Sequence, residues 1–474
     1  MEQHQHQPPH IAIVPSLGVG HVIPLVEFAK LLVSRFHFTV SLLLPTTAND
    51  EPTQAQLSLL HSLPNPISYT FLPPAHLPHG LGLASIISLT MSRSIPFIRA
   101  QLTRQKSRVV ALVTDLFGTD LFDLGKELGI PTYLYYTSTA MCLLFAFHFP
   151  RLDETVSCDF QDMPDPVRLP GCVPIHGKDF FESAHNRQSE GYSMVLQHIK
   201  KYGLADGIFV NTFFDLEPGA IRGLQTEDPN RPPVYPVGPI IRSGLDPDDD
   251  NYECLRWLDR QPTASVLFVS FGSRGSLSNE QFHELAMGLE RSGQRFLWVV
   301  RGTNGTHDEE DPFKFLPYGY LDRNKERGLL VPSWAPQIKV LSHGSTGGFL
   351  THCGWNSILE SMVHGVPVIA WPLGAEQKMN ALMLDEGLKV ALRPKVGEGG
   401  LVEADEIAKV VNDLMEGEEG KNVGRQMKEL CKLAKKAISE DGDSTMLLQE
   451  VALKFELKKN KIHGESKHIQ SVNQ

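Results

Sequence analysis

The stretch HIAIVPSLGVGHVIPLVEFAKLLV, residues 10–33, reads as a short apolar strand, a glycine-spaced loop and an amphipathic helix. Such a unit begins many folds in which a parallel sheet is covered by helices on both faces. The loop around Gly18 and Gly20 allows two functions. It is either a cradle for a dinucleotide or a support that presents His21 at the end of the strand.

The strand and helix pattern is repeated along the chain. Short apolar strands alternate with helical stretches up to about residue 240, and the segment YPVGPIIRSGLDPDDDNYE (235–253) interrupts them. The pattern restarts at SVLFVSFGSRG (265–275). We therefore predict two doubly wound (Rossmann-like) α/β domains facing a central cleft. The expected boundaries are 1–244 for the first domain, 245–255 for an acidic linker, 256–456 for the second domain and 457–474 for a flexible tail.

Composition limits the classes of partner. The 474 residues are 41% hydrophobic and 21% charged, with a net charge of -11, which argues against nucleic acid and anionic membranes as partners. The N-terminus lacks the basic start and apolar core of a signal peptide, and no apolar run reaches the ~20 residues of a membrane span. The six cysteines form no C-x-x-C pair, so neither zinc nor a disulfide framework is indicated. We expect a cytoplasmic monomer that binds small molecules.

The dinucleotide interpretation of the first loop fails on two counts. The fingerprint G-x-G-x-x-G is broken, because Gly18 and Gly20 are followed by Ile23 and Pro24. An acidic residue that would hold the ribose is also missing at the end of the next strand, TVSLLLPTT. A nicotinamide-dependent oxidoreductase is therefore disfavoured, and His21 remains as a candidate base.

The stretch GGFLTHCGWNSILESMVHG (347–365) predicts an anion site. A strand ends at Thr351 and His352, and a helix begins near Asn356 and Ser357. The N–H groups at a helix start attract phosphate-type anions. Ser357 and Glu360 also fit an S-x-x-E capping box, which would be purely structural.

Two further positions are open to more than one interpretation. Trp334 lies in the Pro-flanked loop SWAPQ, where its ring suits stacking on a planar base but could equally pack in the core. Glu376 and Gln377 follow a strand in GAEQ, where a polar pair can grip hydroxyl groups or simply start a solvated helix.

Residues 334–377, WAPQIKVLSHGSTGGFLTHCGWNSILESMVHGVPVIAWPLGAEQ, closely resemble the donor-binding signature of the plant secondary-product UDP-glycosyltransferases. Shorter matches such as IPLVEFAK, DLFGTD and VSFGS extend the resemblance over most of the chain, and it is greatest with the phenol-glucosylating branch. The resemblance implies a fold of the GT-B type. It also implies that UDP-glucose is a co-substrate and that neither a cofactor nor a metal ion is needed.

The resemblance assigns roles to individual residues. Trp334 and Ala335 would bind uracil, and Gln337 and Glu360 would hold the ribose. The diphosphate would meet Ser273, His352, Asn356 and Ser357, and the sugar would meet Trp355, Glu376 and Gln377. His21 would be the catalytic base and Asp115, in VTDLFG, its partner, because strand ends of one parallel sheet lie on one edge.

The expected reaction is the inverting transfer of glucose to a small phenol, which gives an O-β-glucoside. A phenol has a pKa near 10, so a base must take its proton before it attacks. Phe117, Phe145 and Phe147 are candidates for the acceptor pocket. The alternatives are a UDP-sugar-binding protein without activity and a transferase for another UDP-sugar. A metal-dependent mechanism is disfavoured, because the D-x-D spacing in DPDDD (246–250) falls in the linker.

One position departs from the family pattern, in which a tyrosine usually stands where this chain has Gly374. The missing ring should leave extra room beside the sugar and the acceptor. From the sequence we expect Gly374→Tyr to narrow the acceptor range and to lower the Michaelis constant for UDP-glucose.

Overall fold

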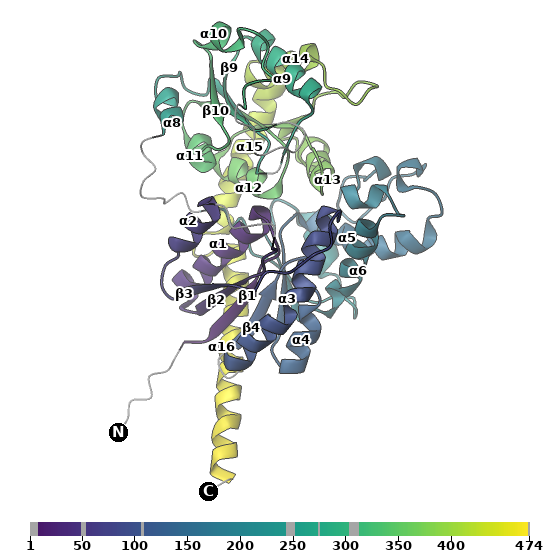
Figure 1. The fold of residues 1–474 in the computed structure, drawn as a ribbon, viewed down its shortest axis with the longest axis vertical. Coiled ribbons are helices and arrows are strands. Elements are labelled where there is room, and N and C mark those ends of the chain that lie inside the picture. Colours follow the sequence, from purple (N-terminus) through teal and green to yellow (C-terminus); the bar gives the residue numbers. More distant parts are fainter. Residues whose placement is uncertain are drawn as a thin grey trace.

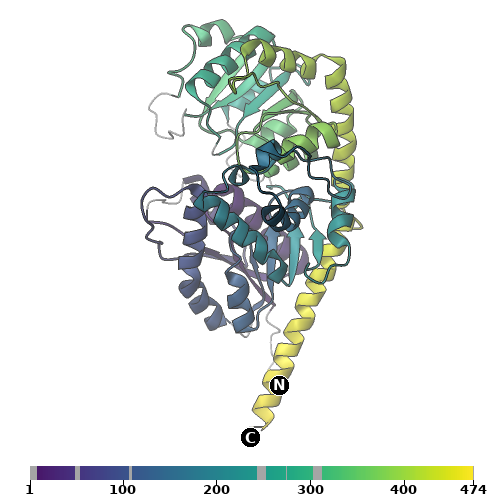
Figure 2. The same ribbon diagram turned by 90° about the vertical axis from the view of Figure 1, so that its right-hand side faces the viewer.

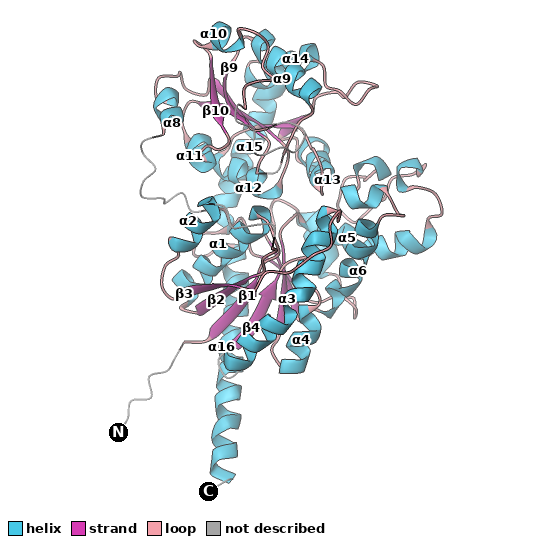
Figure 3. Cartoon of the chain, in the orientation of Figure 1, coloured by secondary structure: helices cyan, strands magenta, loops and turns pink. Residues whose placement is uncertain are grey.

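The computed structural model describes residues 8–48, 54–105, 109–242, 252–273, 275–302 and 312–472, and the acidic DPDDD stretch lies outside these ranges. Each half of the described chain is built around one parallel sheet flanked by helices (Figures 1 and 3). This arrangement confirms the predicted fold of two doubly wound domains.

The N-terminal sheet has the order β3-β2-β1-β4-β5-β6-β7, and all its strand pairs are parallel. The order reverses between β1 and β4, which is the switch point where such sheets bind ligands. The strands are β1 His10–Val14, β2 Thr39–Leu44, β3 Ile67–Phe71, β4 Val109–Thr114, β5 Thr132–Tyr136, β6 Gly207–Val210 and β7 Val234–Pro236.

Strand β1 shows why this sheet is buried on both faces. Its residues point alternately to opposite faces, as in any strand. Ile11 and Ile13 pack in one apolar cluster, and Ala12 and Val14 pack in another on the opposite face. A fully apolar strand is therefore stable only when helices cover both faces, which is the doubly wound arrangement.

The C-terminal sheet repeats this plan with the order β10-β9-β8-β11-β12-β13. Its switch point lies between β8 and β11, where Ser270 pairs with Thr351. The strands are β8 Val266–Ser270, β9 Arg295–Val300, β10 Gly328–Pro332, β11 Thr346–Thr351, β12 Val368–Ala370 and β13 Ala391–Leu392.

Helices follow most strands and cover both sheets (Figure 3). In the N-terminal half they are α1 Val19–Phe36, α2 Gln54–His61, α3 Leu83–Gln105, α4 Leu121–Leu128, α5 Ala140–Thr155, α6 Glu190–Lys201 and α7 Pro218–Gln225. In the C-terminal half they are α8 Glu253–Leu258, α9 Asn279–Ser292, α10 Tyr320–Asn324, α11 Gln337–Ser342, α12 Trp355–His364, α13 Gln377–Leu382, α14 Ala404–Met415, α15 Glu418–Ala437 and α16 Asp443–Val472.

The last helix returns from the C-terminal domain to the N-terminal one (Figures 1 and 2). Phe455 of α16 packs against Phe38 and Tyr133, with ring centroids 6.0 and 5.1 Å apart. The sequence predicts a flexible tail from residue 457, whereas α16 continues to Val472. We propose the division of the chain near residues 244 and 256, with α16 joining the N-terminal domain.

Candidate active site

A cleft of about 1010 Å³ lies between the two domains and takes residues from both into its wall. The N-terminal domain contributes the loops that follow β1, β4 and β5, and the C-terminal domain contributes those that follow β8, β11 and β12. The two switch points therefore face one another across the cleft, as predicted for a pair of doubly wound domains.

His21 and Asp115 meet at the switch point of the N-terminal sheet. Gly18, with φ 101°, starts α1 and places His21 in its first turn, whereas Asp115 directly follows β4. His21 Nδ1 lies 3.1 Å from Asp115 Oδ2. The His21 side chain is 20% exposed and lines the cleft, and Asp115 is fully buried. Contact through Nδ1 leaves Nε2 as the ring nitrogen for another partner.

The buried carboxylate of Asp115 is kept in its charged form by its neighbours. Burial alone raises its pKa, but His21 and the hydrogen bonds from Ser16 together hold the pKa below its usual value. The Ser16 backbone N–H donates to Oδ2 at 2.9 Å, its hydroxyl donates to Oδ1, and the Phe117 N–H donates to Oδ1 at 3.2 Å. Asp115 can therefore stabilise a positive charge on His21. Ser16 was not identified from the sequence, although a polar residue shortly after a buried strand could have indicated it.

The acceptor side of the cleft is mainly apolar. Phe117 lies edge-on to His21 with ring centroids 5.7 Å apart, and it also lies edge-on to His198 at 5.6 Å. Other residues of this wall are Ile87, Leu116, Ala146, Val195 and Ile199. A flat apolar ring can therefore reach the histidine.

Phe145 and Phe147, which we expected at the acceptor pocket, do not line this cleft. Phe145 is fully buried against Phe180, and Phe147 lies under the guanidinium of Arg231. Helix α5 turns only part of its surface to the cleft, and Cys142 and Ala146, four residues apart, occupy that part. The sequence did not reveal which face of α5 this is.

The predicted nucleotide contacts lie together on the opposite wall. Trp334 is 41% exposed in the cleft, and Tyr252 packs edge-on against it with a centroid distance of 5.6 Å. Gln337 Nε2 donates to Glu360 Oε2 at 2.6 Å and to Ser357 Oγ at 3.0 Å. Burial raises the pKa of Glu360 to about 7, against the opposing effect of Gln337. Ala335 is buried beside Trp334.

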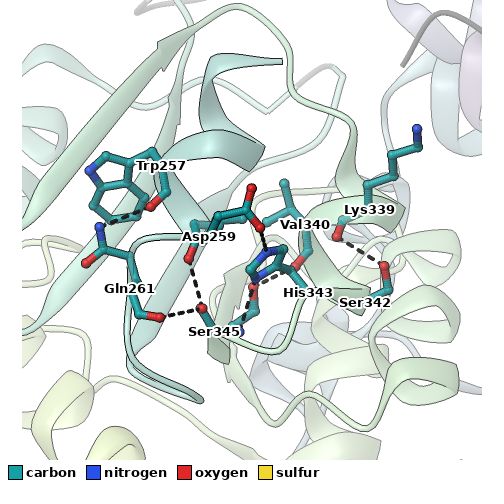
Figure 4. A network of polar contacts seen from close by, with 10 residues as sticks. Trp257, Asp259, Gln261, Lys339, Val340, Ser342, His343 and Ser345 are labelled. Atoms are coloured by element: carbon teal, nitrogen blue, oxygen red, sulfur yellow. Dashed lines mark hydrogen bonds and ion pairs between the residues drawn. The ribbon is translucent and has the colours of Figure 1, made fainter. Parts of the chain in front are cut away.

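A network of polar contacts joins the C-terminal end of α11, Gln337–Ser342, to the residues around the end of α8 (Figure 4). Ser345 Oγ donates to the carbonyl oxygens of Leu258 and Gln261, both at 2.9 Å. His343 Nε2 lies 3.2 Å from Asp259 Oδ1. These contacts tie the residues that follow α11 to the end of α8 and the turn after it.

The start of α12 is where the sequence predicts an anion site. The helix begins at Trp355, and its N-cap residue Gly354 has no side chain to accept from the first-turn N–H groups. Ser357 is therefore the third helical residue, and the capping box that it could form with Glu360 is not present. N–H groups of this kind attract a diphosphate.

His352 and Ser273 complete this part of the wall. Burial lowers the pKa of His352 to about 4, so its imidazole is neutral at pH 7. The ring packs so closely on Gly272 that a Cβ there would lie 2.4 Å from His352 Cε1. Asn356 Nδ2 reaches across the cleft to the carbonyl oxygen of Gly20, 3.3 Å away.

The predicted sugar contacts follow β12. Gln377 Oε1 accepts from the N–H groups of Leu373 and Gly374 at 2.8 and 2.9 Å. Glu376 Oε1 accepts from Asn380 Nδ2 at 3.1 Å, and burial raises the pKa of Glu376. Trp355 lines the cleft but is 2% exposed, and its Nε1 donates to the carbonyl oxygen of Asn211 at 2.8 Å. Its indole therefore also joins the two domains.

The described residues contain no group of three or more His, Cys, Asp or Glu side chains placed to hold a metal ion. Within the same residues, no helix has the length and apolarity needed to cross a membrane.

Two facing Rossmann-like domains, one with a paired histidine and aspartate and the other with an open helix start, form a GT-B nucleotide-sugar transferase. Comparison with known proteins gives the family. Residues 244–421 match the family described as "UDP-glucoronosyl and UDP-glucosyl transferase". Hydroquinone glucosyltransferase of Rauvolfia serpentina is 54% identical over 95% of this chain and 98% of its own length.

Solved structures agree with this result. Phytolacca americana UGT2, complexed with UDP-2fluoro-glucose and pterostilbene, is 64% identical, with a TM-score of 0.88 over 94% of this chain and 100% of that one. A UDP-glucosyltransferase from Polygonum tinctorium capable of glucosylating indoxyl is 51% identical, with a TM-score of 0.89 over 95% and 99%. The chain belongs to the plant UDP-glycosyltransferase family and is a UDP-sugar-dependent glycosyltransferase, so the resemblance is confirmed.

Proposed function

We propose that the enzyme transfers glucose from UDP-glucose to the hydroxyl group of a small phenol, with inversion, to give an O-β-glucoside. The observation that supports this proposal most strongly is the placement of the His21–Asp115 pair and the nucleotide wall of Trp334, Gln337 and Glu360 in one cleft. The base and the donor can thus meet around one acceptor oxygen.

His21 acts as the base in this mechanism. Its neutral imidazole takes the phenol proton while the phenol oxygen attacks the anomeric carbon from the face opposite UDP. The bond between the sugar and the diphosphate breaks, and UDP leaves with the electron pair. Asp115 holds the imidazole in the required tautomer and stabilises the imidazolium. One displacement inverts an α-linked donor to a β-glucoside.

The C-terminal wall binds the donor and stabilises the leaving group. Trp334 and Ala335 bind uracil, and Gln337 and Glu360 hold the ribose. The first turn of α12, with His352, Ser273, Asn356 and Ser357, receives the diphosphate charge, so that no metal ion is required. Glu376 and Gln377 bind the glucose hydroxyls, and Trp355 contacts the sugar without its indole N–H, which is bonded to Asn211.

The apolar wall around Phe117 suits flat aromatic acceptors, and the names of the relatives point in the same direction. Rauvolfia serpentina hydroquinone glucosyltransferase is named for a phenol, and the Phytolacca americana enzyme was solved with pterostilbene. An apolar pocket discriminates only weakly among similar rings, so we propose a broad range of phenols. We also propose that the enzyme acts as a monomer in the cytoplasm.

A panel of phenols incubated with UDP-glucose and analysed by mass spectrometry tests the proposal. We expect a gain of one hexose on small phenols, and NMR of the product should show a β-anomeric proton. UDP binding without any glycoside would indicate a UDP-sugar-binding protein without activity. Faster transfer from a different UDP-sugar would show that this sugar, rather than glucose, is the one the enzyme prefers to transfer.

A further inference from the structure

Glu182 of the N-terminal domain pairs with the loop that carries the proposed sugar contacts. It is the first residue of a single 3₁₀ turn, Glu182–His185. The Glu182 backbone N–H donates to the carbonyl oxygen of Ala375 at 2.8 Å. The Ala375 N–H donates to Glu182 Oε2 at 2.9 Å. Both polar groups of the Ala375 backbone are therefore held by one residue from across the cleft.

This pairing depends on the absence of a side chain at Gly374. A Cβ at Gly374 would lie 2.7 Å from Glu182 Oε2, closer than real Cβ contacts. The carboxylate thus occupies the space that a side chain at position 374 would take. Ala375 itself has φ 49°, a left-handed conformation that a non-glycine residue adopts only when its surroundings impose it.

The loop is fixed from two directions. From inside the C-terminal domain, Gln377 Oε1 accepts from the N–H groups of Leu373 and Gly374. From the N-terminal domain, Glu182 holds Ala375, the residue directly before Glu376. Glu182, Gly374 and Ala375 all line the cleft.

We propose that Glu182 is a positioning residue for the donor sugar: through Ala375 it sets the backbone from which Glu376 and Gln377 reach the sugar hydroxyls. This inference rests on the proposed function, in which Glu376 and Gln377 bind the sugar. Within the described residues, Glu182 forms no hydrogen bond to the residues proposed to bind uridine and diphosphate, so its loss should affect UDP-glucose and not UDP. That difference separates positioning from a general structural role.

Calorimetric affinities for UDP and for UDP-glucose, measured on wild type and variants, test the proposal. We expect Glu182→Ala to weaken UDP-glucose binding about fivefold, the size of one partly exposed hydrogen bond, and to leave UDP affinity within about twofold. Glu182→Gln should restore most of the loss, because its amide oxygen can accept from the Ala375 N–H. Equal effects of Glu182→Ala on both ligands, or none on either, would overturn the proposal.

Lys378→Met is the matched control. Lys378 Nζ also crosses between the domains, to the carbonyl oxygen of Lys178 at 3.3 Å, but it does not bond to the loop backbone at 374 and 375. We expect the ratio of the two affinities to stay as in wild type. If Lys378→Met lost as much UDP-glucose affinity as Glu182→Ala, the effect would come from any contact between the two domains and not from the Glu182–Ala375 pair.

Gly374→Ala supplies a second test through coupling. Its methyl group should displace the Glu182 carboxylate from Ala375, so we expect this variant to lose about as much UDP-glucose affinity as Glu182→Ala. The double variant should lose no more than either single one, because each removes the same contact. Additive losses would contradict the proposal.

These measurements keep the two proposals apart. An enzyme that forms phenol glucosides and whose Glu182→Ala variant binds UDP-glucose normally would retain the proposed function and exclude the positioning role. If the enzyme forms no glucoside, the proposed acceptor chemistry is wrong. The ratio of UDP-glucose affinity to UDP affinity would still decide whether Glu182 positions the sugar loop.

Discussion

His21 Nδ1 lies 3.1 Å from Asp115 Oδ2, although the two residues come from different strand–helix units of the N-terminal domain. Strands β1 and β4 are hydrogen-bonded neighbours, with Val14 paired to Thr114, and each residue follows the end of its strand. The pair thus arises from the sheet order itself. The adjacency of β1 and β4 brings the first turn of α1, which carries His21, beside Asp115.

Replacing His21 by alanine should abolish most turnover and spare nucleotide binding. The base lies in one domain and the proposed nucleotide wall in the other, so UDP affinity should remain within about twofold. We expect kcat to fall by roughly 10² to 10⁴, the usual contribution of a general base. Calorimetry with UDP distinguishes the cases, since a parallel loss of UDP affinity would make His21 a structural residue.

Asp115→Asn should keep the packing and lose the charge. The amide cannot stabilise an imidazolium, so kcat should fall roughly 10²-fold or more while circular dichroism stays as in wild type. Steady-state kinetics with one phenol measure this. Unchanged kcat in a folded Asp115→Asn variant would remove Asp115 from the mechanism.

The positions of His21 and Asp115 could be predicted from the sequence because the rule behind them is general. Parallel strands place their carboxyl ends on one edge, so polar residues after buried strands gather there. The same rule located His352 and Glu376. Phe145 and Phe147 could not be placed, because the rotation of α5 depends on the packing of Phe145 against Phe180 and Phe181 rather than on any local pattern.

Glu182 carried no signal at all in the sequence. It lies in a single 3₁₀ turn between α5 and α6, which is too short for a helical or strand period to be recognised. Its partner Ala375 is 193 residues away and offers only backbone atoms. The helical continuation of α16 to Val472 likewise has no clear signal in the polar composition after residue 457.

Lowering the pH should destabilise the fold through His198. Its ring contacts Thr119 Oγ1 and Ser88 Oγ at 2.7 and 2.9 Å, and burial lowers its pKa to about 4. The unfolded chain takes up this proton near pH 6.5 and the folded chain only near pH 4. The stabilisation is therefore complete above pH 6.5 and is lost as the pH falls toward 4. Between pH 7 and 5 the loss should be roughly 2 kcal/mol.

Urea unfolding of wild type and His198→Gln at pH 7 and pH 5 checks this expectation. The variant should lose roughly 2 kcal/mol less than wild type between the two values, because glutamine does not titrate. His352, whose pKa burial also lowers to about 4, remains in both proteins and contributes equally. The same pH dependence in both proteins would show that His198 takes up its proton as readily folded as unfolded.

Gln377 should favour UDP-glucose among donors. Its Oε1 is engaged by two loop N–H groups, which orients the side chain and leaves Nε2 to donate to the sugar. A sugar of different stereochemistry would leave such a donor unpaired. We expect UDP-glucose to exceed UDP-galactose and UDP-xylose by about tenfold in kcat/KM. Competition between the donors measures it, and preference for either rival would contradict the assignment.

Gly374→Tyr should raise the Michaelis constant for UDP-glucose, which reverses the expectation from the sequence. The family pattern, with a tyrosine at this position, suggests that a ring would fill empty space, but that space holds the Glu182 carboxylate, 2.7 Å from where the new Cβ would lie. The ring should therefore break the contact with Ala375 and loosen the sugar loop, so that the constant rises about fivefold. It should still narrow the acceptor range, because Gly374 lines the cleft.

Kinetics of Gly374→Tyr with one small and one bulky phenol, beside the double variant Glu182→Ala/Gly374→Tyr, separate these two effects. Removing the carboxylate relieves its clash with the ring, so the double variant should bind the donor no worse than Gly374→Tyr alone. It should keep the preference for the small phenol. A Michaelis constant for UDP-glucose in Gly374→Tyr at or below that of wild type would show that a tyrosine at 374 supports the sugar loop without Glu182.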